Sequence, residues 1–413
     1  MITSMKRHPS IRTIEQVLKA DLCLGCGACQ HVVPNKLRVE MSQEGYLRPV
    51  VLAPLTDAEN DIATAVCPGI HVEHDPPLPT GELMWGPVKS CNAGWSTDPA
   101  LRHKASSGGG ISALAGHLLR SGMVDAVLHI GVSEADPLGN VYRISTTPEQ
   151  VAANAGSRYA PAAPLLGLQT ALDQHATIAV IGKPCDIVAV RKLADVDPRV
   201  KEKVRYCLSF MCPGVQSIKG THAVIKALNT KVEDVAEFRY RGNGWSGLAT
   251  ADTHDRQSSS MTYDDSWGKI LNNYLQFRCK VCFDGTGEFA NSTCADAWHS
   301  DKNGYRALSE TAGRSIILAR TNAGQRLLRS ADNWSEIHHE PLDEVHPPAL
   351  QTHQRDRKNY ALAHMLALNS KQIAKPLYNF GSMGSLAILA NPYKLGRNFM
   401  PPFKTSAKRS NGA

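Results

Sequence analysis

Three cysteines spaced three residues apart lie near the start of the chain, and a fourth precedes a proline further on. Cys23, Cys26 and Cys29 share the segment Cys-Leu-Gly-Cys-Gly-Ala-Cys, and Cys67 is followed by Pro68. A triple of this kind can wrap around one face of an iron–sulfur cubane, while a distant Cys-Pro supplies the fourth thiolate. Zinc sites usually pair their cysteines two by two instead. The spacing therefore predicts one [4Fe-4S] cluster held by these four residues.

A second set of four cysteines is scattered through the middle of the chain. Two of them, Cys185 and Cys212, follow short apolar segments that are typical of buried strands. Ligands of an open α/β sheet bind beyond the carboxyl ends of its strands, so these two thiols are expected near each other. The other two form a C-x-x-C pair, which alone could be redox-active, zinc-binding or inert. The predicted ligands of a second [4Fe-4S] cluster are Cys185, Cys212, Cys279 and Cys282, with Cys294 in reserve and Cys91 and Cys207 as buried fillers.

A glycine-rich turn precedes a segment, 111–119, with apolar residues at helical spacing. Unpaired N–H groups at the start of a helix attract anions, and the helix dipole assists. The turn could therefore hold the phosphates of a dinucleotide. Because it lacks the G-x-G-x-x-G spacing, an ordinary flexible turn is the alternative. Its residues are Ser106, Ser107, Gly108, Gly109 and Gly110.

The distribution of charge argues against a nucleic-acid groove. Lys and Arg number 45 against 38 Asp and Glu, a net charge of +7. Seven of the basic residues and no acid lie in residues 371–413, so the rest of the chain is balanced. The excess of positive charge is a property of the tail, not of the folded body.

A chain of 413 residues is long enough for two or three domains. Residues 1–19 are polar and basic without the apolar core of a signal peptide, and no run of 18 apolar residues occurs anywhere. We expect a cytoplasmic protein with no transmembrane segment. In that compartment the eleven cysteines serve as ligands or nucleophiles rather than as disulfides.

Local patterns indicate the elements that would position these residues. Alternating apolar residues in 37–41 and 46–51, joined by a glycine turn, predict a hairpin between the halves of the first cysteine motif. Strand, helix and strand in 177–211 predict an open α/β sheet. The glycine-rich segment 239–247 reads as a shaped loop, and residues 300–370 as polar loops around a strand at 316–318.

Several of these segments together resemble the coenzyme F420 hydrogenase/dehydrogenase beta-subunit family, which also includes 7-hydroxymethyl chlorophyll a reductase. The resemblance spans about residues 85–345, and the order and spacing of its segments are specific. The matching segments are Ser106 to Gly110, Gly182 to Cys185, Phe210 to Gly214, Arg239 to Gly247, and Cys279 to Asp284 with its continuation through Glu288, Phe289 and Ala290 to Asp296 and Trp298.

The resemblance implies an α/β body that binds FAD beside a cysteine-ligated cluster, preceded by a small ferredoxin-like [4Fe-4S] domain. It implies a phosphate cradle at Ser106 to Gly110 and a flavin-side contact at Lys183, and it supports the same four ligands for the second cluster. The expected domains are a ferredoxin-like domain (1–72), a proline-rich linker (73–84), the N-terminal (85–172) and C-terminal (173–345) family domains, and an extension with a basic tail (346–413).

A flavin exchanges electrons in pairs and a cubane one at a time, so this chain is predicted to join a two-electron substrate to a one-electron donor. Three hypotheses stay open. The first is a ferredoxin-dependent flavin reductase of a small organic molecule. Relatives also occur among surface-polysaccharide biosynthesis proteins, so a sugar-linked substrate is a further alternative. The second is an oxidoreductase that exchanges hydride with coenzyme F420, and the third is a non-catalytic electron-transfer subunit. The expected partners are ferredoxin or another redox protein and a small-molecule substrate, and self-association into a homo-oligomer is left open.

Overall fold

The computed structural model describes residues 8–299, 311–342, 348–370 and 374–378. Its helices are α1 (Ile14–Lys19), α2 (Ala28–Val32), α3 (Asp57–Ala65), α4 (Pro99–Lys104), α5 (Gly110–Arg120), α6 (Pro148–Ala153), α7 (Leu168–Gln174), α8 (Pro184–Leu193), α9 (Pro198–Lys203), α10 (Ile218–Ala227), α11 (Phe277–Lys280), α12 (Asn322–Asn333) and α13 (Pro348–Ser370). Short 3₁₀ helices are η1 (Thr80–Glu82), η2 (Pro164–Gly167), η3 (Val232–Asp234) and η5 (Leu271–Tyr274), and η4 (Asp264–Ile270) is a π-helix. None of these described helices is both long enough and apolar enough to cross a membrane.

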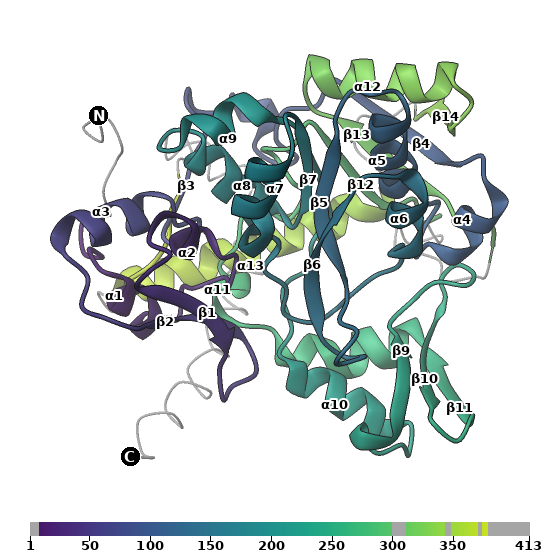
Figure 1. The fold of residues 1–413 in the computed structure, drawn as a ribbon, viewed down its shortest axis with the longest axis horizontal. Helices are drawn as coiled ribbons and strands as arrows, with labels where there is room; N and C mark the ends of the chain where they lie inside the picture. The colour runs from purple at the N-terminus through teal and green to yellow at the C-terminus, as the bar shows by residue number, and fades with distance from the viewer. Residues whose placement is uncertain (1–7, 300–310, 343–347, 371–373, 379–413) are drawn as a thin grey trace.

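An eight-stranded mixed sheet forms the centre of the described part of the chain (Figure 1). In spatial order its strands are β14 (Ile337–Pro341), β4 (Ser90–Ser96), β13 (Ser315–Ala319), β12 (Ser292–Asp296), β8 (Val204–Phe210), β7 (Ile178–Gly182), β5 (Ala126–Val132) and β6 (Asn140–Ser145). β12, β8, β7 and β5 run parallel, and the outer strands pair antiparallel. The carboxyl ends of these four parallel strands therefore lie at one edge of the sheet.

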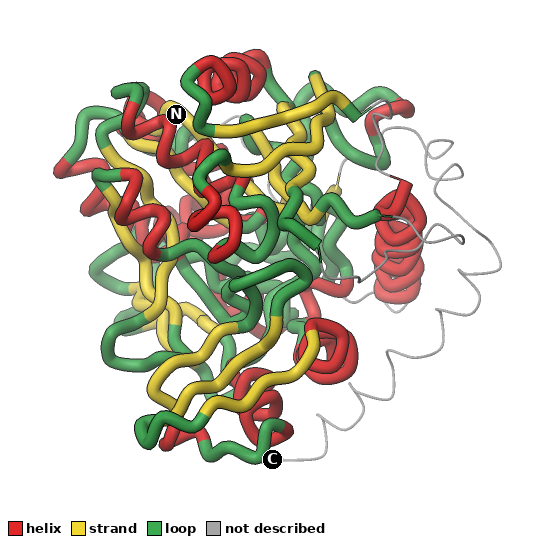
Figure 2. The backbone as a smooth tube through the Cα atoms, turned by 90° about the vertical axis from the view of Figure 1, so that its right-hand side faces the viewer, coloured by secondary structure: helices red, strands yellow, loops and turns green. Residues whose placement is uncertain are grey.

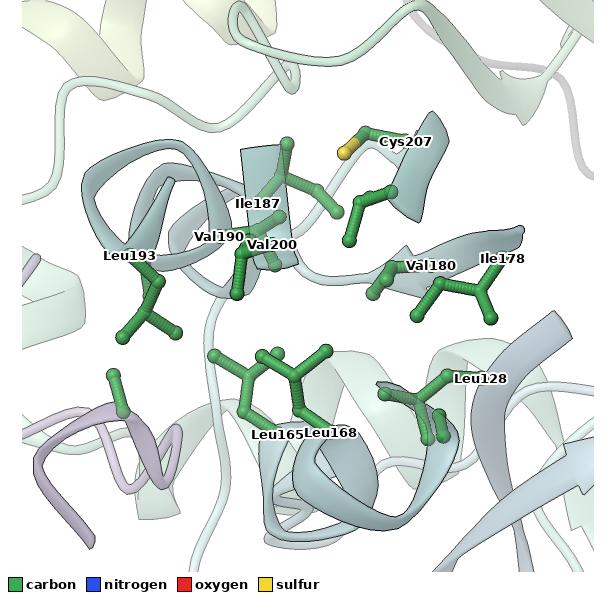
Figure 3. Packing of buried hydrophobic residues seen from close by; sticks show 14 of the residues in the cluster. Leu128, Leu165, Leu168, Ile178, Val180, Ile187, Val190, Leu193, Val200 and Cys207 are labelled. Atoms are coloured by element: carbon green, nitrogen blue, oxygen red, sulfur yellow. The ribbon is translucent and has the colours of Figure 1, made fainter. Parts of the chain in front are cut away.

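Helices cover both faces of this sheet. Successive side chains of a strand point to opposite faces. Ile178 and Val180 pack with α7 and α8 in one apolar layer (Figure 3), whereas Ala179 packs with α5 and α12 in the other. Strands that are buried on both faces are typical of parallel α/β sheets. The predicted α/β body is thus confirmed.

Three smaller sheets complete the described strands. β1 (Leu37–Met41) and β2 (Leu47–Val51) form the hairpin predicted in the first domain. β9 (Val235–Arg239), β10 (Leu248–Thr253) and β11 (Ser258–Thr262) pack on α10 at the base of the molecule (Figure 2). β15 (Leu377–Tyr378) pairs in parallel with β3 (His71–Val72), so a segment of the C-terminal extension returns to the N-terminal domain.

The prediction of polar loops in residues 300–370 is wrong for three segments, of which β14 is a strand. The strand at 316–318 is present within β13, but α12 and α13 are helices. In α12 the residues Leu327, Leu328 and Ala331 are buried on one face, while most of its other residues are polar. Because only this narrow stripe of α12 is apolar, the polar composition of the segment as a whole suggested a loop. Residues 379–413, which hold most of the basic tail, lie outside the described residues.

Candidate cluster and flavin site

The first four cysteines line one pocket in the N-terminal domain. Cys23, Cys26, Cys29 and Cys67 surround it together with apolar side chains of α1 and the β1–β2 hairpin. The loop bends tightly between the first cysteines, because Gly25 has a φ of 68° and a Cβ there would come within 2.7 Å of the carbonyl oxygen of Leu47. The N–H of Gly25 donates to Cys23 Sγ at 3.4 Å.

Without a metal, burial keeps the thiols of this pocket protonated. Burial raises the pKa of Cys23 to about 11 and also raises the pKa of Cys29, to which the neighbouring thiols of Cys23 and Cys67 add. A thiolate would therefore be costly here without a cation, whereas cluster assembly removes the protons and supplies the compensating charge. The donor set and the apolar lining fit a [4Fe-4S] cluster.

The second group of cysteines lies at the carboxyl edge of the large sheet. β7 and β8 are adjacent and parallel with Gly182 opposite Ser209, so Cys185 and Cys212 follow neighbouring strand ends. Cys279 joins them from α11. These three thiols are close enough for Cys212 and Cys279 to add to the effect of burial and raise the pKa of Cys185. Cys282 adds in the same way to the raised pKa of Cys279.

Two N–H groups are aimed at one sulfur of this inner group. The backbone N–H of Val215 lies 3.3 Å from Cys279 Sγ, and Gln276 Nε2 lies 3.5 Å from it. Hydrogen bonds to sulfur are one of the means by which proteins adjust iron–sulfur clusters. The inner group therefore has the donors, and part of the surrounding shell, that a second cubane would use.

Neither group is arranged for a single metal ion. Within the described ranges, no three His, Cys, Asp or Glu side chains have the geometry to hold one. A cubane is larger than an ion, so its thiolates stand further apart. The two ligand sets stay predictions that the grouping of the thiols supports.

The remaining cysteines pack in apolar layers. Cys207 and Cys91 are buried among aliphatic side chains, as predicted for fillers. Cys294 lies on β12 in the layer beneath α5, and burial raises its pKa to about 12. This position favours a packing role for Cys294 over that of a reserve ligand.

Arg278 joins the two cysteine groups. It is 1% exposed and precedes Cys279 directly in α11. Its Nε donates to the carbonyl oxygen of Gly69 at 2.6 Å and its Nη2 to that of Pro68 at 3.1 Å. The residue next to one inner ligand is thus hydrogen-bonded to the two residues that follow the outer ligand Cys67. The sequence analysis missed Arg278, and only its adjacency to the C-x-x-C pair could have indicated it.

The glycine-rich turn leads directly into α5, as predicted. Gly109 caps the helix with a φ of 74°, and a Cβ at Gly108 would come within 2.7 Å of the carbonyl oxygen of Gly94. The hydroxyl of Ser315 accepts from the N–H groups of Gly108 at 3.0 Å and Gly110 at 3.4 Å. A phosphate at this turn would have to use other N–H groups of the helix start or replace this hydroxyl.

Ser106 and Ser107 connect the turn to neighbouring segments. Ser106 Oγ accepts from the N–H of Ser157, and Ser107 Oγ donates to the carbonyl oxygen of Arg314 at 2.9 Å. The chain after Ser157 continues to Ala162, whose carbonyl oxygen accepts from Lys183 Nζ at 2.9 Å. One short segment therefore links the glycine-rich turn to the lysine beside Cys185.

Lys183 is buried and ion-paired. Its Nζ lies 2.7 Å from Asp186 Oδ2, and these side chains are 10% and 1% exposed. Burial alone would lower the pKa of Lys183, but Asp186 and the thiol of Cys185 raise it above its ordinary value. The result is a buried ion pair beside Cys185, in which the carboxylate of Asp186 raises the pKa of that thiol more than Lys183 lowers it. Its predicted contact with a flavin stays a prediction.

A cluster of one buried arginine and several aromatic residues lies next to the glycine-rich turn. From the sequence, these residues were indicated only by the family resemblance. Arg241, 2% exposed, donates to both carboxylate oxygens of Asp296 at 2.9 and 3.0 Å. Trp245 Nε1 donates to the same carboxylate, and its ring stacks on Trp298 at 4.6 Å. The N–H of Gly244 bonds to His103, shortly before the turn. The ion pair and the stacked rings hold this loop against the carboxyl end of β12.

Comparison with known proteins agrees with these features. Residues 91–169 match the N-terminal part, and residues 175–345 the C-terminal part, of the coenzyme F420 hydrogenase/dehydrogenase beta subunit. The chain is 24% identical over 274 residues to coenzyme F420 hydrogenase subunit beta of Methanococcus voltae, covering 64% of this chain and 89% of that relative. It is 21% identical over 344 residues to a subunit of the F(420)H(2) dehydrogenase of Methanosarcina mazei, covering 79% and 87%.

A solved structure has the same fold. A chain of the F420-reducing [NiFe] hydrogenase complex from Methanosarcina barkeri superposes with a TM-score of 0.57 at 21% identity, covering 75% of this chain and 98% of that one. The two matched ranges together make up more than half of the sequence and contain both the glycine-rich turn and the inner cysteines. This chain therefore belongs to the coenzyme F420 hydrogenase/dehydrogenase beta-subunit family.

Proposed function

We propose that this chain is an iron–sulfur flavoprotein oxidoreductase that moves electrons between a one-electron donor such as ferredoxin and a two-electron small-molecule substrate. The outer cysteine group would hold one [4Fe-4S] cluster, the inner group a second, and the α/β body FAD. The observation that carries the proposal is the gathering of eight cysteines into two groups that Arg278 connects. When bound, FAD would supply the exchange between hydride and single electrons.

The residues of the chain would bind and orient these groups. The thiolates would hold the clusters, and the buried ion pair of Lys183 and Asp186 would fix the start of α8 beside the inner one. Arg278 keeps the outer ligand loop against α11, so that the separation between the clusters is fixed. Arg241 and Asp296 hold the loop that carries Trp245 against the carboxyl end of β12.

Coenzyme F420 is the second candidate for the two-electron partner. The names of both relatives include it. In that version reduced F420 would exchange hydride at the flavin, and a one-electron protein would exchange electrons at the outer cluster. The same names describe subunits, so an electron-transfer subunit that serves a larger complex is the remaining alternative.

Iron, sulfide and flavin analysis of anaerobically purified protein tests the proposal. The expected result is FAD and about eight irons per chain, because each of two cubanes holds four. Absorbance spectra before and after addition of reduced ferredoxin or reduced F420 then identify the donor, since the competent donor bleaches the flavin. Zinc without flavin would contradict the proposal and make the cysteines structural.

Arg278→Met is expected to loosen the contact between the two cluster loops. The change leaves the buried carbonyl groups of Pro68 and Gly69 without their donor, which costs about 1–3 kcal/mol. Flavin reduction by ferredoxin should slow in stopped-flow measurements, while the iron content stays unchanged. Arg355→Met, at an exposed position of α13, is the matched control. An unchanged rate in Arg278→Met would show that this contact does not lie on the electron path.

A further inference from the structure

The helix α13 covers the inner cysteine group from outside the family-matched ranges. The matched ranges end at residue 345, and α13 spans Pro348–Ser370. Ala361, Leu362 and Met365 of this helix pack against Val281 and Phe283, which flank Cys282. In Figure 1 the yellow α13 runs from the purple N-terminal domain past α11 towards the large sheet. The helix thus separates this side of the inner cysteine group from solvent.

One charged side chain of α13 points at that group. Arg357 Nη1 donates to the carbonyl oxygen of the inner ligand Cys212. The guanidinium lies flat against Gly285, because a Cβ there would come within 2.7 Å of both Cζ and Nε. Gly285 in turn accepts from the N–H of Cys212 at 2.8 Å. The guanidinium therefore lies between the proposed ligand Cys212 and the loop that follows the C-x-x-C pair.

The guanidinium is only partly hydrogen-bonded. Its Nε is buried and, among the described residues, has no hydrogen-bond partner. Burial alone would lower the pKa of Arg357, but the sulfurs of Cys282, Cys212 and Cys279 raise it. An arginine is charged at every relevant pH, so a permanent cation faces the three sulfurs.

A permanent cation of this kind changes the energy of an electron on the cluster. Reduction adds one negative charge to a cubane whose thiolates already make it negative. In a partly desolvated site a nearby positive charge stabilises that reduced form more than the oxidised one. Net charge and burial are among the factors that set the potentials of iron–sulfur clusters. The guanidinium therefore favours reduction.

We propose that Arg357 raises the reduction potential of the inner [4Fe-4S] cluster and so lets it accept single electrons from the outer one. In that step the outer cluster is oxidised by one electron, the inner cluster is reduced by one, and Arg357 keeps its proton. This inference rests on the proposed function and adds to it a residue from the C-terminal extension.

Redox titration followed by electron paramagnetic resonance tests the role of Arg357. In Arg357→Gln the equilibrium constant for reduction of the inner cluster is expected to fall about tenfold, which for one electron corresponds to about 59 mV. The outer cluster should keep its potential. Arg357→Lys retains the charge and should shift the potential less. Arg355→Gln is the matched control, because Arg355 is an exposed arginine of the same helix.

Gly285→Ala gives an independent test that leaves the arginine in place. The added methyl group would displace the guanidinium from its position against the loop, so the potential should fall in the same direction. Unchanged potentials in Arg357→Gln and Gly285→Ala, with full iron content, would overturn the inference. If both Arg357→Gln and Arg357→Met lose the inner cluster while Arg357→Lys keeps it, the positive charge of residue 357 is required to stabilise that cluster. Loss in all three would show a packing role and overturn the inference.

Iron analysis of the unaltered protein separates the two proposals. About four irons per chain, all of them lost in Cys26→Ala, would mean that the inner cluster does not exist, and the proposed function would fail together with the inference. About eight irons with no effect of the Arg357 variants would leave the proposed function intact and remove the role of Arg357 alone.

Discussion

Cys26→Ala is expected to remove about half of the iron, four of about eight atoms per chain, and to abolish electron exchange with ferredoxin. Cys26 is buried in the pocket that all four outer cysteines line, so no other thiol there is left over to replace it. The inner group and the flavin site lie on other segments and should be preserved. Flavin reduction by a small chemical reductant should therefore persist, and iron analysis with stopped-flow absorbance measures both effects.

Cys282→Ala should remove the other half of the iron. The outer cluster should then still accept electrons from ferredoxin, but the flavin should no longer be reduced by that route. Cys294→Ala is the matched control, because Cys294 is a buried cysteine of the apolar layer beneath α5 and should retain all of the iron. Full iron content in Cys282→Ala, or loss of iron in Cys294→Ala, would refute the inner ligand set.

Lys358→Met is expected to lower the free energy of unfolding by about 3–5 kcal/mol, since it breaks a buried ion pair from one side. Lys358 Nζ lies 3.1 Å from Glu288 Oε1, and these side chains are 4% and 9% exposed. Nζ also donates to the carbonyl oxygen of Leu83. The lysine thus ties α13 to the linker and to the loop after the inner cysteines. The urea midpoint of the anaerobic protein measures the loss.

The partner and the control sharpen this prediction. The double variant Lys358→Met with Glu288→Gln removes both charges and should be more stable than Lys358→Met alone. Arg355→Met, at an exposed position of the same helix, should change stability by less than about 0.5 kcal/mol. A loss below about 1 kcal/mol in Lys358→Met would mean that the pair contributes little.

The ion pair of Lys358 and Glu288 is expected to make the stability of the protein depend on pH. Burial alone would raise the pKa of Glu288, but Lys358 and His74 lower it from 4.5 to about 2. A depressed folded-state pKa stabilises the fold above the unfolded value, so this contribution is complete above pH 4.5 and is lost as the pH falls towards 2. In Glu288→Gln the stability of the protein should depend less on pH within that window.

Local patterns in the sequence determined a large part of this protein. The alternation in 37–41 and 46–51 produced the predicted hairpin, and the strand, helix and strand around Cys185 and Cys212 appear as β7, α8 and β8. These features depend on periods of two or 3.6 residues, which a sequence displays directly. The prediction that both cysteines follow neighbouring strand ends succeeded for the same reason.

Only the tertiary structure decided what surrounds the cysteines. Arg278 meets residues more than two hundred positions away, and Arg357 and Lys358 reach back from a helix that the sequence analysis had read as loop. Single long-range contacts leave no periodic trace, because they depend on how whole elements pack. The sequence by itself therefore determined which residues could bind clusters. The packing of α11 and α13 decided which cations lie beside them, since charge acts through space and not along the chain.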